Sequence, residues 1–413
     1  MKEKRIVITG IGVVSSIAVG KDDFWKGLLA GKNGIKTITV SDLSDVDSHF
    51  SYEIPDLDYE KYMGQKPSSC VDRATRFLLV ATKLAIKDGK LEEIIKNRHS
   101  EVGVVTGTQY GCLHSNFEFH RTTLLKGPAF VNPMRFPGTI INYSSSMVSM
   151  FFKADALNTT VSSGTAAGAD AVGYACKMIE DDRAKIVLTS GLADVDLEDF
   201  FIIYSQKHRG FRLLPNCPDG KTPVVRPFDK SADGLVMGEG ATVLILEELK
   251  HAKKRGAQVL AEVLGYSSAY DSENNKRTLE KAMRSAIEDA GKKPEDIDYI
   301  CASANGWLPG DQKELQAINE VFKDRKKDLA ISSIKSMVGE LCGGSGPTQV
   351  AAACFSIRDS DIPPTLNFQN LPENTGATGV ITGKKQSKKI DLAMINSFGY
   401  DGNNACLVIG RTD

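Results

Sequence analysis

Histidine is scarce in this 413-residue chain, and none follows His251. The six histidines stand at positions 49, 99, 114, 120, 208 and 251. The remaining C-terminal stretch therefore offers no imidazole for general acid or base catalysis. The eight cysteines are scattered without C-x-x-C spacing, so neither a zinc site nor a redox pair is predicted. We expect no metal and no cofactor.

The chain also lacks an excess of charge of either sign. Lys and Arg together number 51, and Asp and Glu together number 52, which gives a net charge of −1. This balance argues against nucleic acid or an anionic membrane as the principal ligand. No run of about 18 or more uncharged apolar residues is present, so no membrane span is predicted. The N-terminal Arg5-Ile-Val-Ile-Thr9 is strand-like, and we expect a cytoplasmic protein with reduced thiols and no signal peptide.

Short β-branched segments alternate with longer amphipathic or alanine-rich segments. The strand candidates are residues 102–106, 185–189, 241–246 and 392–395, and the helix candidates are residues 74–89, 165–181, 246–256, 275–291 and 312–323. Strands spaced by helices predict an α/β protein with largely buried sheets. The strand and helix pattern restarts after residues 254–258. We therefore expect an N-terminal half, residues 1–250, and a C-terminal half, residues 251–413, related by duplication.

The segment Thr9-Gly-Ile-Gly12 resembles the start of a G-x-G-x-x-G dinucleotide fingerprint. Ser15 stands where the third glycine belongs, and no phosphate-binding context follows. We interpret the segment as a tight turn from a strand into a loop.

Two longer segments carry a more specific signal. One is Val161-Ser-Ser-Gly-Thr-Ala-Ala-Gly168, and the other is Asp296-Ile-Asp-Tyr-Ile-Cys-Ala-Ser-Ala-Asn-Gly-Trp-Leu-Pro-Gly-Asp-Gln-Lys-Glu314. They resemble the patterns (S/T)-(A/G)-C-(T/A)-(S/T)-G and D-Y-V-N-A-H-G-T-x-T-x-x-x-D-x-x-E of β-ketoacyl-ACP synthases. Similar frames at Arg226-Pro-Phe-Asp229 and Asn396-Ser-Phe-Gly-Tyr-Asp-Gly-Asn-Asn404 extend the resemblance over residues 5–410.

The reactive side chains of that family are absent. Thr165 stands at the position of the nucleophilic cysteine, Ser303 at the first catalytic histidine, and Glu340 at the second. A cysteine at a helix N-terminus has a lowered pKa, whereas a threonine hydroxyl needs an adjacent base. Ser303 cannot act as that base, and Glu340 would repel a malonyl carboxylate or its enolate. We therefore predict no catalytic residue in this chain.

Other family positions persist, namely Lys335, Asp311, Glu314 and Phe398. The resemblance implies a buried ion pair of the lysine and glutamate near the site, and a gating role for the phenylalanine. We expect Lys335 to pair with Glu314 or with Glu340, because an unpaired buried lysine would cost several kcal/mol.

This combination resembles the inactive members of the family, the chain-length factors of type II polyketide synthases. The resemblance implies a thiolase-like α/β fold, with duplicated αβαβα layers and two central mixed sheets. It also implies a heterodimer with an active ketosynthase, contact with an acyl carrier protein, and a tunnel that sets product length. The pathway would make an aromatic polyketide or an aryl polyene, and antibiotic biosynthesis is one such role.

Candidate tunnel and interface residues follow from the same resemblance. Leu113, Asn116 and His120 would share one helix face, with ordinary packing as the alternative. Residues 140–152 and 158–161 are candidates for the subunit interface, with burial inside one chain as the alternative. The basic clusters at residues 253–255, 325–327 and 384–389 would either contact an acidic carrier protein or face solvent.

Two other functions stay open. The first is a homodimeric condensing enzyme or acyltransferase with Thr165 or Ser163 as its nucleophile, which would act without a partner. The second is a carrier-protein- or acyl-binding module, which would form a stable homodimer on its own.

Overall fold

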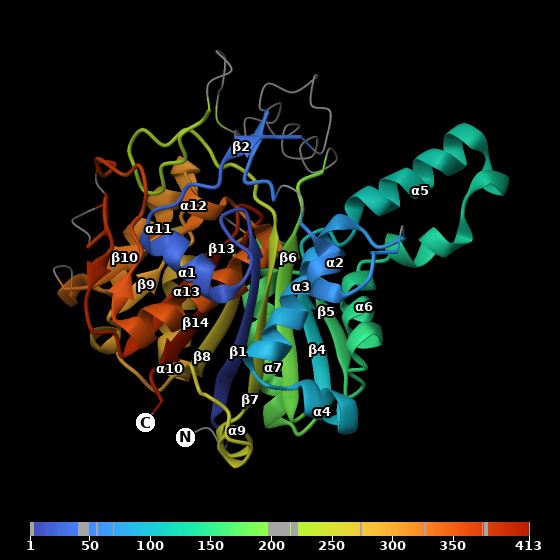
Figure 1. Cartoon of the computed structure of the whole chain (residues 1–413). Helices are drawn as coiled ribbons and strands as arrows, with labels where there is room; N and C mark the ends of the chain where they lie inside the picture. Colours follow the sequence, from blue (N-terminus) through green and yellow to red (C-terminus); the bar gives the residue numbers. More distant parts are fainter. Residues whose placement is uncertain are drawn as a thin grey trace.

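The computed structural model describes residues 4–39, 49–54, 57–68, 70–196, 215, 222–272, 275–325, 328–373, 375 and 379–412. These residues form a ten-stranded mixed sheet with helices packed against it (Figure 1). His208, Cys217 and residues 326 and 327 of one basic cluster lie outside the described residues.

The N-terminal half contributes five neighbouring strands. In spatial order they are β1 (Ile6–Ser15), β7 (Gly240–Glu248), β6 (Ile186–Ala193), β4 (Val102–Gly107) and β5 (Asn158–Val161). β7 runs antiparallel to β1 and β6, while β4 runs parallel to β6 and β5. Every residue of β1 and β4 is buried, as expected for strands rich in Val and Ile with both faces covered.

The C-terminal half repeats this arrangement. Its strands, in spatial order, are β8 (Ala261–Tyr270), β14 (Asn403–Gly410), β13 (Leu392–Phe398), β9 (Tyr299–Cys301) and β10 (Ala330–Ser332). β14 runs antiparallel to β8 and β13, while β9 runs parallel to β13 and β10. The same order and directions in both halves are the duplication expected from the sequence. The domain boundary at residue 250 stays a prediction.

The two halves meet at β1 and β8. These strands pair antiparallel over only three residue pairs, from Ile6 with Val263 to Ile8 with Ala261. The two expected sheets are therefore two halves of one continuous sheet. Two small sheets lie apart from it, formed by β2 (Lys36–Thr37) with β3 (Phe50–Ser51) and by β11 (Asp361–Ile362) with β12 (Gln386–Ser387).

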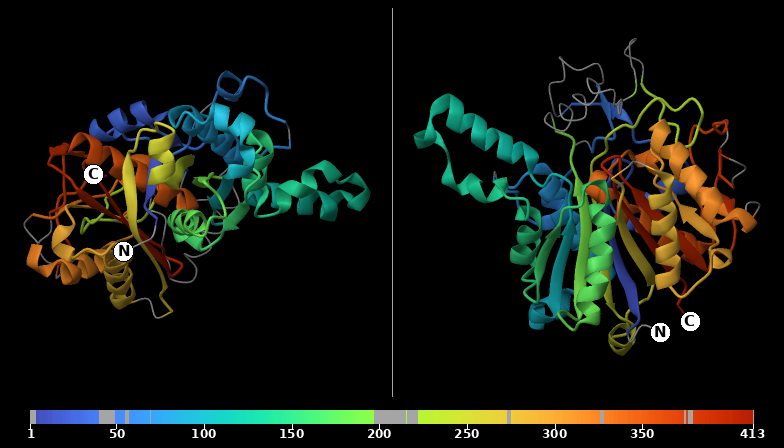
Figure 2. Two further views of the ribbon diagram at one scale, coloured as in Figure 1. Left: turned by 90° about the horizontal axis from the view of Figure 1, so that it is seen from below. Right: turned by 180° about the vertical axis from the view of Figure 1, so that it is seen from behind.

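Helices separate and cover the two halves. α7 (Ala167–Glu180) and α13 (Ser345–Asp359) contact each other and contact strands of both halves, so they form a central layer. On the outside, α3 (Arg73–Asp88) packs on β1, β6 and β7, and α10 (Lys276–Asp289) packs on β8 and β14 beside α11 (Leu308–Val321). This order gives the expected αβαβα layers (Figure 2).

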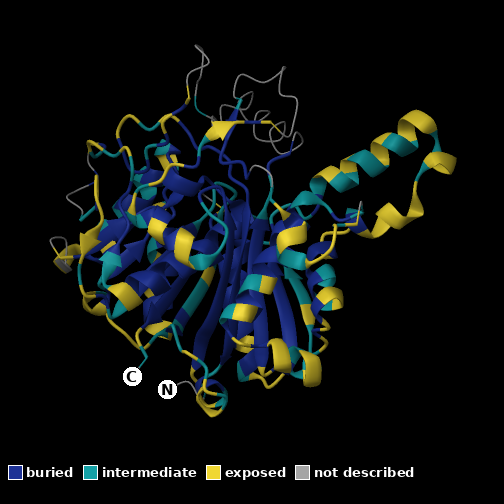
Figure 3. Cartoon of the chain, in the orientation of Figure 1, coloured by how far each residue is buried: buried dark blue, intermediate teal, exposed yellow. Residues whose placement is uncertain are grey.

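The remaining helices connect or extend these layers. They are α1 (Lys21–Leu29), α2 (Tyr59–Met63), α4 (Glu92–Asn97), α5 (Leu113–Lys126), α6 (Tyr143–Phe152), α9 (Leu249–Lys254) and α12 (Lys335–Val338). α9 begins later than predicted because β7 continues to Glu248. α5 and the short 3-10 helices that follow it, η2 (Pro128–Phe130) and η3 (Pro133–Thr139), project from the body of the molecule and are largely exposed (Figures 1 and 3).

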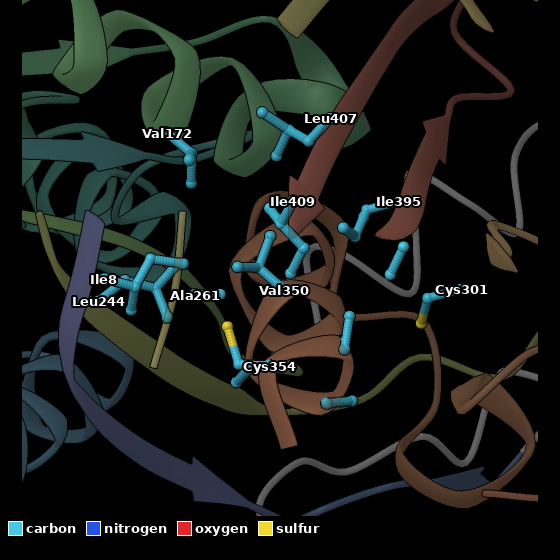
Figure 4. Packing of buried hydrophobic residues seen from close by; sticks show 14 of the residues in the cluster. Ile8, Val172, Leu244, Ala261, Cys301, Val350, Cys354, Ile395, Leu407 and Ile409 are labelled. Atoms are coloured by element: carbon cyan, nitrogen blue, oxygen red, sulfur yellow. The ribbon is translucent and has the colours of Figure 1, made fainter. Parts of the chain in front are cut away.

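The core is centred on α13, whose residues from Ser345 to Ile357 are all buried. Val350 and Cys354 of this helix lie among apolar side chains from both halves of the sheet, labelled in Figure 4 as Ile8, Leu244, Ala261, Ile395, Leu407 and Ile409. The one large polar side chain in this stretch, Gln349, donates its amide to the carbonyl oxygens of Cys301, Ala302 and Asn396. The helix therefore ties its neighbours together by hydrogen bonds as well as by packing.

The turn predicted at residues 9–12 is wrong. These residues lie inside β1, which spans Ile6 to Ser15, and the pairing with β7 only shifts register between Ile8 and Gly10. Gly12 is needed for close approach, because a Cβ atom at this position would lie 1.9 Å from the carbonyl oxygen of Ala81 in α3. The glycine thus allows α3 to pack directly against the strand.

The described cysteines behave as small apolar residues. None forms a disulfide, and all but Cys70 are buried. Burial raises the pKa of Cys301 to about 12, so this thiol stays protonated at neutral pH. None of the helices in the described part of the chain combines the length and apolarity needed to cross a bilayer.

Candidate functional site

Thr165 lies at the start of the central helix α7, where a nucleophile was expected by resemblance. β5 leads into a turn, and the 3-10 helix η4 (Gly164–Ala166) then continues into α7. Thr165 is buried, and its backbone N–H donates to Oδ2 of Asp401 at 2.8 Å. Its hydroxyl donates to Oδ1 of the same carboxylate at 3.3 Å. A carboxylate from the β13–β14 loop therefore covers the start of the helix.

Two glycines make room for this carboxylate. Gly164 has a φ of +58°, and a Cβ atom there would lie 1.7 Å from Oδ2 of Asp401. At Gly399 a Cβ atom would lie 2.2 Å from Oδ1 of Asp401 and 2.0 Å from the Thr165 hydroxyl. Any other side chain at either position would displace the carboxylate, so the close contact depends on both glycines.

Ser303 follows β9 and holds the end of β13. Its hydroxyl donates to the carbonyl oxygen of Phe398 at 3.0 Å and accepts the N–H of Phe398 at 2.9 Å. Its own N–H donates to Oε1 of Glu314 at 2.9 Å. The hydroxyl oxygen of Ser303 also accepts a hydrogen bond from Lys335 Nζ at 3.4 Å. The donor and both acceptor positions of the Ser303 hydroxyl are therefore used by Phe398 and Lys335.

Glu340 forms a closed polar network with Lys335. Lys335 Nζ lies 2.8 Å from Oε2 of Glu340, and both side chains are buried. Glu340 also accepts hydrogen bonds from Asn305 Nδ2 at 2.7 Å, Ser345 Oγ at 2.7 Å and the N–H of Cys342 at 3.0 Å. Burial favours a raised pKa, but the charge of Lys335 and these donors outweigh it and lower the pKa of Glu340. Of the two partners expected for Lys335, the structure selects Glu340.

The other two retained acids hold loops. Glu314 accepts from the N–H of Ser303 and from Asn396 Nδ2, both at 2.9 Å. Asp311 accepts three backbone N–H groups, from Phe228 at 2.8 Å and from Asn305 and Gly306 at 3.0 Å. Burial raises the pKa of Asp311 to about 7. Both carboxylates accept backbone N–H groups and so hold the segments around β9 and α11 in place.

A small, partly open hollow lies beside this network. Ser303, Asn305, Trp307, Phe398 and Tyr400 are among the residues that line it. In the described part of the chain, its lining does not include Thr165, Lys335 or Glu340. The aromatic side chain of Phe398 therefore borders a hollow that does not reach the start of α7.

Comparison with known proteins identifies the family. Residues 3–252 match the model described as "Beta-ketoacyl synthase, N-terminal domain", and residues 260–369 match "Beta-ketoacyl synthase, C-terminal domain". The chain belongs to the β-ketoacyl synthase family. Its duplicated αβαβα architecture is accordingly the thiolase-like ketosynthase fold expected from the sequence.

Relatives within the β-ketoacyl synthase family include both catalytic and paired proteins. A Synechocystis protein named 3-oxoacyl-[acyl-carrier-protein] synthase 2 is 34% identical over 100% of this chain and 99% of its own length. A solved structure called the ishigamide ketosynthase/chain length factor is 30% identical, with a TM-score of 0.89 over 99% of this chain and 100% of that chain. Another, a type II polyketide synthase acyl-carrier protein in complex with its ketosynthase, has a TM-score of 0.86 at 25% identity, covering 99% of this chain and 100% of that chain.

The tunnel residues expected in this β-ketoacyl synthase family member are spread along α5. Leu113 begins the helix and lines a small hollow together with Thr108, Gln109 and Met237. Asn116 donates its amide to the carbonyl oxygen of Thr139 at 3.0 Å and so fastens η3 to α5. His120 is exposed. The structure does not bring the three together around one cavity, and their tunnel role stays a prediction.

The expected interface segments lie at the surface. α6 buries one side against α3, while Met150 is 74% exposed on the other side and Ile140 and Ile141 precede the helix as exposed residues. β5 is the edge strand of the large sheet. Exposed apolar side chains continue along α5, η2 and η3, and they include Phe117, Leu124, Leu125, Phe130, Met134 and Phe136. α6 is thus partly buried within the single chain and partly exposed, β5 is mostly half-buried, and the interface role of both segments stays a prediction.

Sequence reasoning missed Asp401 and Asn305, which complete the two clusters. Asn305 lies within the second motif, at a position where the family pattern has a threonine. Asp401 interrupts the glycine-rich Gly399-Tyr-Asp-Gly402. An acidic side chain inside such a loop was the available signal, because a charged residue there needs nearby donors.

Proposed function

We propose that this chain is a catalytically silent ketosynthase-like subunit, a chain-length factor that pairs with an active ketosynthase and shapes its product cavity. The observation that carries the proposal is the closed network around Glu340. Lys335, Asn305, Ser345 and the N–H of Cys342 supply four donors to one carboxylate. A group so fully bonded and held ionised neither donates a proton to a developing enolate nor tolerates its charge.

The start of α7 supports the same proposal. Thr165 would need a general base, and Asp401 is the carboxylate within reach, at 3.3 Å from the hydroxyl. The other oxygen of that carboxylate accepts the N–H of Thr165 at 2.8 Å, which is where an oxyanion would have to be stabilised. A base that also occupies the oxyanion position cannot assist acyl transfer to the same residue.

Two observations support a ketosynthase as the partner: an exposed apolar surface on this chain and the likeness to a solved ketosynthase/chain length factor. The exposed apolar side chains of α5, η3 and α6 form a projecting surface that a second subunit would cover. The ishigamide ketosynthase/chain length factor resembles this chain over nearly its full length. An acyl carrier protein would deliver substrate to the active subunit of the pair, and its proposed contacts are Lys253, Lys254 and the basic residues of 384–389. Arg255, the third member of the 253–255 cluster, is bound to the buried Glu247 and is left out.

The test compares the chain alone with the chain beside a ketosynthase. Purified protein is incubated with acyl carrier protein loaded with acetyl and malonyl groups, and intact mass and condensation product are measured. We expect no acyl adduct and no product. When an active type II ketosynthase is co-expressed, we expect a 1:1 complex, and poor solubility of this chain without it. Acylation of the isolated wild-type chain, or a stable and active homodimer, would contradict the proposal.

One observation favours the alternative of an acyltransferase. The hydroxyl of Ser163 donates to Oδ2 of Asp170, whose Oδ1 accepts the hydroxyl of Tyr266 at 2.7 Å. Burial raises the pKa of Asp170, which makes it a better proton acceptor than an exposed carboxylate. If the isolated chain becomes acylated, the adduct should map to Ser163 and disappear in Ser163→Ala. Acylation that persists in Ser163→Ala would exclude this serine.

A further inference from the structure

Asp401 occupies a position that a bound anion would otherwise take. The start of a helix carries N–H groups without partners within the helix and a partial positive charge. At α7 the N–H of Thr165 donates to Asp401, a residue 236 positions away in the sequence. A carboxylate supplied by the chain itself thus satisfies a donor that would stabilise the oxygen of a substrate thioester.

The loop that carries Asp401 is fixed. The N–H of Gly399 donates to the carbonyl oxygen of Asn403 at 2.8 Å, and the N–H of Asn403 donates to Oδ1 of Asp401 at 3.1 Å. The N–H of Asp271 donates to the carbonyl oxygen of Gly402 at 2.8 Å. These bonds close the β13–β14 connection on itself and on β8. The backbone bonds fix the position of the Asp401 main chain, and the bonds to the N–H groups of Asn403 and Thr165 and to the Thr165 hydroxyl hold its carboxylate against the start of the helix.

We infer that Asp401 is an internal plug, which excludes acyl groups and other anions from the start of α7 and suppresses any nucleophile at position 165. This role rests on the proposed function, because it explains how the silent site is kept closed. It also goes further, since it predicts that a cysteine alone would not restore reactivity. A thiolate at position 165 would form beside the Asp401 carboxylate, and a neighbouring like charge raises a thiol pKa.

The experiment measures the reactivity of a thiol placed at the plugged position. Thr165→Cys, Thr165→Cys/Asp401→Asn and Thr165→Cys/Asp401→Gly are each treated with iodoacetamide over a range of pH. Peptide mass spectrometry follows alkylation at position 165 and separates it from the natural cysteines. The asparagine variant keeps an acceptor of the same shape without the charge, and the glycine variant empties the position.

We expect slow alkylation of Thr165→Cys, with an increase of about threefold to fourfold at neutral pH for every unit by which the thiol pKa falls when the charge is removed, because the larger thiolate fraction is partly offset by lower nucleophilicity. The glycine variant should react at least as fast as the asparagine variant. Thermal unfolding of each variant checks that the fold is kept, and unfolded samples give the full thiol rate as a reference. A merely structural cap would leave the pH profile of alkylation unchanged.

Equal alkylation rates and equal pH profiles with and without the Asp401 carboxylate would overturn the plug. That result would leave the proposed function untouched, because the silent-subunit proposal is tested by acylation of the wild-type chain. Conversely, acylation of wild-type protein at Ser163 would contradict the silent-subunit proposal. Slow alkylation of Thr165→Cys would in that case still support the role of Asp401 as a plug.

Discussion

Lys335 Nζ and Glu340 Oε2 lie 2.8 Å apart in the interior of the protein, and Asn305 Nδ2 approaches the same oxygen at 2.7 Å. By resemblance, the position of Glu340 is that of the family's second histidine, and in this chain it holds a buried carboxylate with its own counter-ion. The pair gives Lys335 a structural partner inside the protein. Removing either charge leaves the other buried without compensation.

Replacing Glu340 by Gln should destabilise the protein by about 3–5 kcal/mol, because the buried Lys335 charge then has no counter-ion. Urea unfolding followed by circular dichroism measures the change. The double variant Lys335→Met/Glu340→Gln is the matched control, and it should be more stable than Glu340→Gln alone. Equal stability of the single and double variants would show that the pair is not coupled.

Ser303→Ala should cost about 1–2 kcal/mol, because it removes both bonds that hold the backbone of Phe398. Ser356→Ala is the matched control, since Ser356 is equally buried but its hydroxyl has no hydrogen-bond partner within the described structure. It should be neutral or slightly stabilising. The same loss in both variants would refute the structural role assigned to Ser303.

Stability should fall in acid because of Glu247 in β7. Burial favours a raised pKa for this group, but hydrogen bonds from Arg255, His251 and Thr9 outweigh it and lower the pKa from its ordinary 4.5 to about 2. A lowered folded pKa stabilises the protein above the unfolded pKa, and this contribution is lost as the pH falls from about 4.5 to about 2. The loss amounts to about 3 kcal/mol.

The measurement compares the unfolding free energy of wild type and Glu247→Gln at several pH values between 5 and about 2. The glutamine variant should be less stable at pH 5, and the two curves should converge in acid. Parallel curves over this range would mean that Glu247 titrates alike in the folded and unfolded chain.

Met150→Lys should abolish association with the ketosynthase partner and leave the stability of the single chain within about 0.5 kcal/mol, because Met150 is 74% exposed. Tyr270→Lys is the matched control, since Tyr270 is 67% exposed at the end of β8. Size-exclusion chromatography of the co-expressed pair reports the complex. Retention of the complex with Met150→Lys would contradict an interface at α6. Loss of the complex with Tyr270→Lys would equally contradict it, because an exposed lysine on β8 would then have the same effect.

The architecture was predictable from sequence because strand and helix patterns are local and the motif frames fix their order. The side-chain contacts between residues that are distant in sequence were not predictable. The contact between Thr165 and Asp401 joins residues 236 positions apart, and no periodicity connects them. The choice between Glu314 and Glu340 for Lys335 likewise depended on where α12 ends and the next turn begins. Residues 9–12 were misread because glycines that serve close helix packing have the same sequence pattern as glycines in a turn.

The central helix α13 has consequences for the order in which the molecule assembles. Almost none of its residues is exposed to solvent. Its small residues, including Ala351, Ala352 and Ala353, therefore stabilise the helix only when strands from both halves already pack against them. During synthesis β7 is completed well before α13 leaves the ribosome. The face of the N-terminal strands that α13 covers in the finished protein is therefore exposed to solvent until α13 has been made. Chaperone dependence should therefore be concentrated in that interval.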